Sequence, residues 1–321
     1  MIRWGILGLG HIAHKFAQDL LTLPNARLVA VASTDQTRAD EFAARYDVAN
    51  AFGTYEGLLR LADLDVVYVA TRHVKHHENT LMLLRAGKAV LCEKPFGMNA
   101  GQVQEMVDTA RTQGVFLMEA LWSRFMPALQ QAHHWVETGS IGQIVNLRAD
   151  FGFAAPFDPA GRLFDKQLGG GALLDIGIYP LFLSYLLLGK PASLKASATF
   201  GQTGADEQCG MVLTYDSGAV AVLDATLLAK TDCVGIIYGT QGTIRIHSRF
   251  HEAKTVTLEQ PGHDPKIVSF DRSTNGYTYE AEHVNDCLTA GRTESVLWSL
   301  DDSVALMNLL DAVRAEAGIV Y

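Results

Sequence analysis

Residues 2–13 of this 321-residue chain read IRWGILGLGHIA, and this stretch decides the fold. An apolar segment, residues 2–7, runs directly into Gly8 and Gly10, and an amphipathic segment begins at about Ile12. The order predicts a buried strand, a tight turn and a helix. The GxGxxA spacing in this context is typical of a Rossmann domain, in which the start of the first helix binds the pyrophosphate of a dinucleotide.

Each residue of this turn has a physical role. Gly8 permits the tight turn, Gly10 lets the backbone approach a pyrophosphate, and Ala13 lets the helix pack closely on the strand. His11 and Ile12 stand at the start of the helix, where free N–H groups and the positive dipole end face the phosphates. The alternative is a packing turn in another doubly wound protein.

Apolar strands and amphipathic helices alternate outward from this turn to about residue 120. Strands are expected over residues 27–32, 66–70, 89–92 and 116–119, and helices over residues 12–21, 37–45, 75–86 and 99–113. Unalternating apolar strands separated by helices indicate a parallel sheet covered on both faces. Residues 1–121 are therefore predicted to be an α/β dinucleotide-binding Rossmann domain.

The pattern changes after residues 125–127. Helices are expected over residues 128–137, from the glycines at 169–171 to 188, and over 279–290 and 299–316; a strand over 144–153 and a succession of alternating segments between residues 193 and 269, the last named at 255–258, complete the pattern. Residues 122–321 are predicted to be an α+β substrate-binding domain with a large, mostly antiparallel open sheet. Residues 219–228 and 233–238 are apolar at consecutive positions, which predicts a homodimer through this sheet.

The composition of the chain limits the classes of partner that it can bind. The formal net charge of −9 argues against nucleic acid or an anionic membrane. Four widely spaced cysteines without a CxxC pair, and no visible targeting signal, predict a cytoplasmic, reduced protein. The most apolar stretch, residues 173–188, is shorter than the roughly 20 residues that span a bilayer, so a buried helix is expected there.

The end of the second predicted strand bears on the choice of cofactor. NAD enzymes usually carry an acid there that binds the adenosine ribose. Here Ser33 and Thr34 come first and Arg38 lies one helical turn on. Hydroxyls and a guanidinium suit a 2′-phosphate, so NADP is favoured, while Asp35 keeps NAD open.

Two further segments point to chemistry. Glu93, Lys94 and Pro95 follow a predicted parallel strand, where ligands of open α/β sheets bind. Lys94 there can reach a substrate hydroxyl and the nicotinamide ribose, and the bond to Pro95 is a candidate for the cis form. Asp175 and Tyr179, four residues apart, share one face of an otherwise apolar helix.

These side chains suit hydride transfer. Tyr179 can pass a proton to or from a carbonyl or alcohol oxygen, and a nearby ammonium such as Lys94 would lower the pKa of the phenol. Asp175 could orient the pair or bind substrate hydroxyls. Hydride transfer by such a pair needs no metal, and no metal-ligand spacing surrounds the histidines at 73, 76 and 77, so no metal site is expected.

The Rossmann turn, Glu93-Lys94-Pro95 and the segment GGGALLDIG at residues 169–177 together resemble the glucose–fructose oxidoreductase/inositol dehydrogenase (Gfo/Idh/MocA) family over essentially the whole chain. Many members have histidine where this chain has Tyr179. That variant, with EALWSRF at residues 119–125, is similar to the branch containing dimeric dihydrodiol dehydrogenases and NADP-dependent D-xylose dehydrogenases.

The resemblance implies roles for particular residues. Lys94 and Tyr179 would be the catalytic pair. The nicotinamide side would be lined by Thr71, Arg72, His73 and His76, with Trp122 and Arg124 beside them. Substrate would meet Lys94, Trp122, Asp175 and Tyr179. Many relatives have Pro-Asn where this chain has Arg72-His73, which argues against an inositol substrate.

The leading hypothesis is an NAD(P)-dependent dehydrogenase or reductase acting on CH–OH groups of a polyhydroxylated small molecule, either an aldose at C1 or a vicinal or trans-dihydrodiol alcohol. The alternative is a non-catalytic NAD(P)-sensing regulator on the same fold, which predicts loss of Lys94 or Tyr179. An internally recycling enzyme would carry an export signal or an arm over the cofactor; this chain starts at its first strand, so exchange of free cofactor is expected.

Overall fold

The computed structural model describes residues 1–321, and the chain divides into two units. The first unit comprises Met1–Trp122 and Ser273–Val304, and the second comprises Ser123–Arg272 and Ala305–Tyr321. The chain first passes from one unit to the other between Trp122 and Ser123, next to the expected boundary between residues 121 and 122. The return of Ser273–Val304 to the first unit differs from the expected division, which assigned all of residues 122–321 to the second domain.

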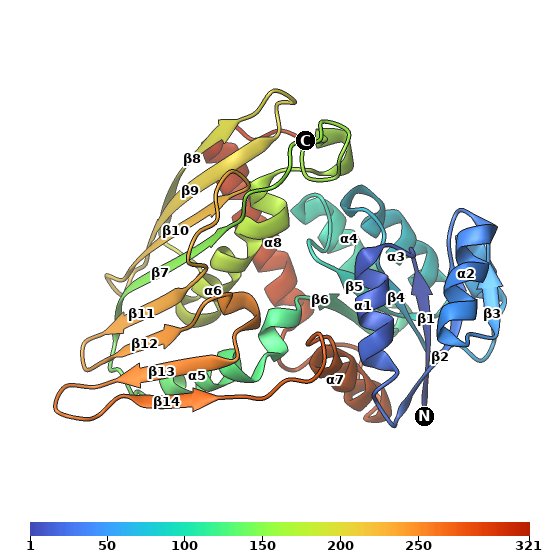
Figure 1. Ribbon diagram of the computed structural model, residues 1–321, viewed down its shortest axis with the longest axis horizontal. Helices are drawn as coiled ribbons and strands as arrows, with labels where there is room; N and C mark the ends of the chain where they lie inside the picture. The colour runs from blue at the N-terminus through green and yellow to red at the C-terminus, as the bar shows by residue number, and fades with distance from the viewer. The chain divides into compact units, whose positions relative to one another are not determined.

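The first unit contains a six-stranded parallel sheet in the order β3-β2-β1-β4-β5-β6 (Figure 1). Its strands are β1 (Ile2–Leu7), β2 (Ala26–Ala32), β3 (Asn50–Phe52), β4 (Val66–Val69), β5 (Ala89–Glu93) and β6 (Leu117–Ala120). Its helices are α1 (His11–Leu20), α2 (Gln36–Tyr46), α3 (His76–Arg85), α4 (Ala100–Gln113) and α7 (Thr278–Thr289). Every residue of β4, β5 and β6 is buried, as a sheet covered on both faces requires.

Long-range hydrogen bonds explain why the returning segment belongs to the first unit. The Asp19 carboxylate in α1 accepts from the backbone N–H of Asn275 at 2.9 Å and of Tyr277 at 2.8 Å. The Trp4 indole in β1 donates to Asn285 in α7 at 2.9 Å. These partners lie more than 250 residues apart in sequence, so no local pattern announces them.

The second unit contains an eight-stranded sheet in the order β14-β13-β12-β11-β7-β10-β9-β8. Its strands are β7 (Ile144–Gly152), β8 (Ser193–Phe200), β9 (Asp206–Thr214), β10 (Val220–Thr226), β11 (Gly235–Gly239), β12 (Thr243–Ile246), β13 (Thr255–Glu259) and β14 (Lys266–Ser269). Only β7 and β10 pair in parallel; all other neighbours are antiparallel. The large, mostly antiparallel sheet is confirmed.

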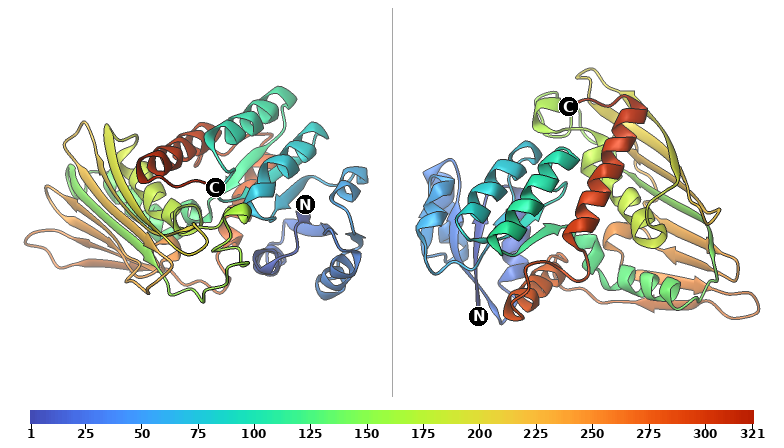
Figure 2. Two further views of the ribbon diagram at one scale, coloured as in Figure 1. Left: turned by 90° about the horizontal axis from the view of Figure 1, so that it is seen from above. Right: turned by 180° about the vertical axis from the view of Figure 1, so that it is seen from behind.

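Helices cover one face of this second sheet. The helix α5 (Pro127–Glu137) packs on β12 and β13, and α6 (Ile178–Leu188) packs on β7 and β10. Figure 2 shows no helix on the other face. On that face Val222 of β10 stands between Arg148 of β7 and Val212 of β9, and each valine is 43% exposed. The helix α8 (Leu300–Ala317) ends close to the end of the chain.

Three details differ from expectation. The short strands β3 and β14 were not predicted, because three or four residues carry too little pattern. The helical run after the glycines is not one α-helix: it opens with a π-turn, Leu173–Gly177, and continues as α6. The helical stretch Lys166–Leu188 is longer than the apolar segment seen in the sequence, and by length and composition it could cross a membrane; 78% of its most apolar window is buried inside the structure, so the expected buried helix is confirmed.

Candidate active site

The turn between β1 and α1 leaves room for a phosphate group. Gly8 has φ +90°, and a Cβ there would lie 2.8 Å from the Ala70 carbonyl oxygen. A Cβ on Gly10 would meet no atom within 4 Å, so open space lies in front of the helix start. Gly10 is the N-cap of α1 and no side chain caps the helix, which leaves the first N–H groups for an anion. Ala13 is fully buried, as close helix–strand packing requires.

The end of β2 presents the predicted residues for the adenosine side. Ser33 is buried and its hydroxyl accepts from the backbone N–H of Asp35 at 3.2 Å. Asp35 is the N-cap of α2, and its Oδ1 accepts from the backbone N–H of Arg38 at 3.0 Å. Thr34 and the Arg38 side chain are exposed. The carboxylate is thus engaged in capping, while a hydroxyl and a guanidinium face solvent.

The loops after β4 and β5 are tied together by His76. Its ring is fully buried, with Nδ1 2.8 Å from the Pro95 carbonyl oxygen and Nε2 3.1 Å from the Thr71 carbonyl oxygen. Burial lowers the pKa of His76, although its hydrogen bonds to the two carbonyls act in the opposite direction. His76 therefore supports the loop that carries Thr71, Arg72 and His73, whose side chains are half-buried, exposed and half-buried respectively.

Lys94 stands at the carboxyl end of β5, as predicted. Its backbone N–H donates to Glu93 Oε2 at 3.2 Å, and its bond to Pro95 is cis. The Tyr68 hydroxyl in β4 donates to the other oxygen of Glu93. Burial raises the pKa of Tyr68 well above its usual range, so the phenol keeps the proton that it donates. Tyr68 thereby fixes the carboxylate beside Lys94, a contact that the sequence did not reveal.

A second carboxyl lies near Glu93. Glu280 in α7 is fully buried, and burial raises its pKa well above its usual range, with Glu93 and Asp19 raising it further. Glu280 was not predicted, because it lies in the segment that returns to the first unit.

Asp175 belongs to the π-turn of the second unit. It is 6% exposed, and its Oδ1 lies 2.8 Å from Arg162 Nη1. π-turns inside helical runs are frequent at functional sites. Arg162 comes from the loop before the glycines and was not predicted, because an arginine in an irregular segment has no distinguishing pattern.

Tyr179, in the first turn of α6, is buried among aromatic rings. The His251 ring centroid lies 5.1 Å from that of Tyr179, and the Phe151 centroid lies 5.5 Å away. Phe151 and His251 stack at 4.2 Å. The Ser123 hydroxyl donates to the His251 carbonyl at 2.6 Å and fixes its segment. These rings hold the Tyr179 side chain in place; they come from β7 and a short turn, and the sequence did not point to them.

The predicted site residues are divided between the two units. The first unit contains the cradle, Lys94 and Trp122, whose indole stacks on Tyr277 at 4.6 Å. The second contains Arg124, which is buried, together with Asp175 and Tyr179. No group of three or more His, Cys, Asp and Glu side chains has the arrangement of a metal site.

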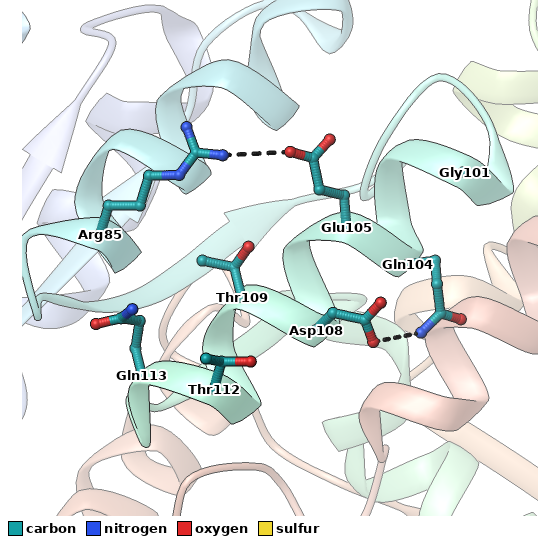
Figure 3. Close-up of a pocket in the computed structure, with 8 residues that line it drawn as sticks. All are labelled: Arg85, Gly101, Gln104, Glu105, Asp108, Thr109, Thr112 and Gln113. Atoms are coloured by element: carbon teal, nitrogen blue, oxygen red, sulfur yellow. Dashed lines mark hydrogen bonds and ion pairs between the residues drawn. The ribbon is translucent and has the colours of Figure 1, made fainter.

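An open pocket on the outer side of α3 and α4 includes none of these residues (Figure 3). It is lined by Arg85, Gly101, Gln104, Glu105, Asp108, Thr109, Thr112 and Gln113. Arg85 pairs with Glu105 at 3.2 Å, and Gln104 with Asp108 at 2.8 Å. These four side chains pair with one another on an exposed helix surface, and none of the predicted site residues lies there, so no function is assigned to the pocket.

A parallel sheet in this order, with a glycine cradle before an uncapped helix and a lysine at a strand end, is typical of the dinucleotide-binding domain of Rossmann-fold proteins. The model of the oxidoreductase family with an NAD-binding Rossmann fold matches residues 2–121, and the GFO/IDH/MocA C-terminal domain matches residues 129–245. The chain belongs to the GFO/IDH/MocA oxidoreductase family, which confirms the resemblance.

Relatives of known name cover the full chain. Trans-1,2-dihydrobenzene-1,2-diol dehydrogenase of Danio rerio is 40% identical over 100% of this chain and 98% of the relative. The Homo sapiens protein of that name is 34% identical with the same coverage. A 3-ketoreductase from Actinomadura kijaniata, solved with NADP and TDP-benzene, is 28% identical with a TM-score of 0.87 and covers 98% of both chains.

Proposed function

We propose that this protein is an NADP-dependent dehydrogenase that oxidises one hydroxyl of a diol or polyol, with Lys94 and Tyr179 as its acid/base pair. The observation that carries the proposal is that the chain has both a lysine at the carboxyl end of β5 in the first unit and a tyrosine in the buried first turn of α6 in the second unit. The named relatives, 34–40% identical over the full chain, support a trans-dihydrodiol as the first substrate to test, ahead of an aldose at C1.

Each side chain has one task in this reaction. A bound nicotinamide would supply the hydride acceptor for the carbinol carbon, and the cradle at Gly8 and Gly10 would hold its dinucleotide. Lys94 binds the reacting oxygen, and Tyr179 takes the hydroxyl proton as the C–H bond breaks; in the reverse direction Tyr179 returns that proton. Asp175, held by Arg162 at 2.8 Å, accepts a hydrogen bond from the neighbouring substrate hydroxyl. Trp122 supplies an apolar wall that helps to exclude water.

The adenosine side supports NADP. One carboxylate oxygen of Asp35 accepts a hydrogen bond from the backbone N–H of Arg38 and caps the helix. Thr34 and Arg38 then offer a hydroxyl and a positive charge to a 2′-phosphate.

A substrate panel tests the activity. Trans-dihydrodiols, D-xylose and D-glucose would each be assayed with NADP and with NAD, following reduced cofactor by absorbance. The proposal expects turnover of at least one member, with a larger kcat/KM for NADP. Tight binding of NADPH without turnover of any substrate in either direction would favour a non-catalytic sensor instead.

We further propose that the protein is a cytoplasmic homodimer that assembles through the second sheet. Val212 and Val222 are exposed side by side on the helix-free face of the second sheet, with Arg148 next to them. A second copy of this chain would bury that face. Val222→Asp should then convert a homodimer to a monomer in light scattering at micromolar concentration, and a monomeric wild-type protein would contradict it. Four free, buried cysteines suit the reducing cytoplasm.

A further inference from the structure

A pair of residues outside the site holds the start of the helical run that carries Tyr179. Asp206, the first residue of β9, is fully buried. Its Oδ2 accepts from the backbone N–H of Leu173 at 2.7 Å, and its Oδ1 accepts from the Tyr321 hydroxyl at 3.2 Å. Leu173 opens the π-turn, so the carboxylate satisfies an N–H group that has no partner within the first turn of a helix.

The local sequence provides no cap of its own. Ala172 stands at the N-cap and has no side-chain acceptor, although Ser, Thr, Asp or Asn is preferred there. Gly171 has φ +141°, and a Cβ at this position would overlap the Asp206 carboxylate and lie 3.1 Å from the Tyr321 hydroxyl. The glycine therefore allows the turn to approach a cap that comes from another strand.

Tyr321 is fixed in turn by α8. The Arg314 guanidinium carbon lies 4.9 Å from the centre of the Tyr321 ring. Burial raises the pKa of Tyr321 well above its usual range, so its hydroxyl remains a donor. Burial raises the pKa of Asp206 to about 6, which still leaves the carboxylate ionised at neutral pH. The cap on Leu173 is therefore a charge-assisted hydrogen bond, which is stronger than a neutral one.

We propose that Asp206 and Tyr321 are positioning residues for the acid/base step: by fixing the first turn of the run, they fix where Tyr179 presents its hydroxyl. The proposal rests on the proposed function of Tyr179. The π-turn continues directly into α6, so a shift of Leu173 is passed along to Asp175 and Tyr179. A misplacement of about 1 Å at a reacting group can reduce turnover by about 10²-fold.

Tyr321→Phe is the test, because it keeps the ring beside Arg314 and removes only the donated hydrogen bond. Amide hydrogen exchange over residues 171–178, read by mass spectrometry, should accelerate about tenfold. The kcat should fall about 3- to 30-fold. The Kd for NADPH, from fluorescence titration, should stay within about twofold of wild type, because the cradle belongs to the first unit.

The matched control is Tyr215→Phe. Tyr215 is also buried, and its hydroxyl lies 2.5 Å from Ser184 Oγ, further along the same helix. The kcat of the Tyr215→Phe variant should stay within about twofold of wild type, and its amide hydrogen exchange at residues 171–178 should be unchanged. Asp206→Asn keeps an oxygen acceptor for the Leu173 N–H and should recover most of the kcat that Asp206→Ala loses.

Two outcomes overturn the positioning role. One is unchanged exchange over residues 171–178 in Tyr321→Phe; the other is a kcat equal to that of the Tyr215→Phe control. Normal turnover in Tyr179→Phe is a separate result that overturns the proposed function, while the exchange measurement still decides whether Asp206 and Tyr321 hold the helix.

Discussion

The two sheets of this protein bury their side chains in different ways. In β4, β5 and β6 every residue is buried, because helices lie on both faces of the parallel sheet. In β10 buried and exposed residues alternate from Ala221 to Ala225, because helices cover only one face. A sheet of the first kind can present function only at the ends of its strands. A sheet of the second kind has a whole face left for a partner.

The same difference shapes the proposed site. The first unit places Lys94 directly after the last residue of β5, at the start of a run of bends. The second unit places Tyr179 on a helix that packs across the sheet. The position of Lys94 therefore depends on one turn, whereas that of Tyr179 depends on the packing of a whole helical run.

The largest predicted effect tests whether Lys94 of the first unit and Tyr179 of the second unit act in the same chemical step. Lys94→Met and Tyr179→Phe should each reduce kcat by about 10²–10⁴-fold, which corresponds to about 3–5 kcal/mol. The double variant should be little worse than the more damaged single variant, because groups that act in one step are strongly non-additive. Steady-state kinetics measure this, with two controls: Tyr215→Phe, and Lys75→Met at an exposed lysine that pairs with Glu78. Fully multiplicative losses would mean that the two residues act in separate steps.

The next effect concerns one buried carboxyl of the first sheet. Burial raises the pKa of Glu119 to about 7, although it accepts hydrogen bonds from the Phe96 N–H and the Trp298 indole. An acid whose folded pKa is raised stabilises the fold fully below its unfolded pKa of about 4.5 and loses this contribution as pH rises through about 7. The free energy of unfolding should therefore fall by up to about 3 kcal/mol between pH 4.5 and pH 7.5.

Urea unfolding at several pH values measures this loss. Glu119→Gln, which cannot ionise, should flatten the curve over the same range. Asp206, whose pKa burial raises to about 6, offers the corresponding test in the second unit over about pH 4 to 6. An equally steep curve in Glu119→Gln would assign the pH dependence to other groups.

Features of the site that depend on residues close together in the sequence could be predicted from the sequence. The cradle at Gly8 and Gly10, the lysine after β5 and the apolar helix with Tyr179 all follow from local pattern. The supports of those side chains do not: Tyr68, Arg162 and His251 reach the site from distant segments. The return of α7 to the first unit was also hidden, since it depends on hydrogen bonds between residues at opposite ends of the chain.

A matched pair of valines tests the comparison of the sheets directly. Val67 in β4 is fully buried, whereas Val222 in β10 is 43% exposed. Val67→Ala should cost about 2 kcal/mol of unfolding free energy, since it removes buried methyl groups and leaves a cavity. Val222→Ala should cost less than about 0.5 kcal/mol when measured at a protein concentration at which light scattering shows a monomer. Equal costs would mean that the open face is as tightly packed as the closed sheet.

The smallest predicted effect tests whether the first unit alone selects the cofactor. Arg38 lies in the first turn of α2, which follows Ser33 and Thr34 in the chain, and its exposed guanidinium can pair with a 2′-phosphate that NAD lacks. Arg38→Ala should weaken NADPH binding about tenfold, or about 1.4 kcal/mol, and leave NADH binding within about twofold. Arg45→Ala, an exposed arginine on the same helix, is the control for loss of charge alone. Fluorescence titration of NADPH and NADH measures these affinities. Tighter binding of NADH than of NADPH by the wild-type protein would contradict the preference for NADP, and Asp35 would then be the residue that binds the ribose.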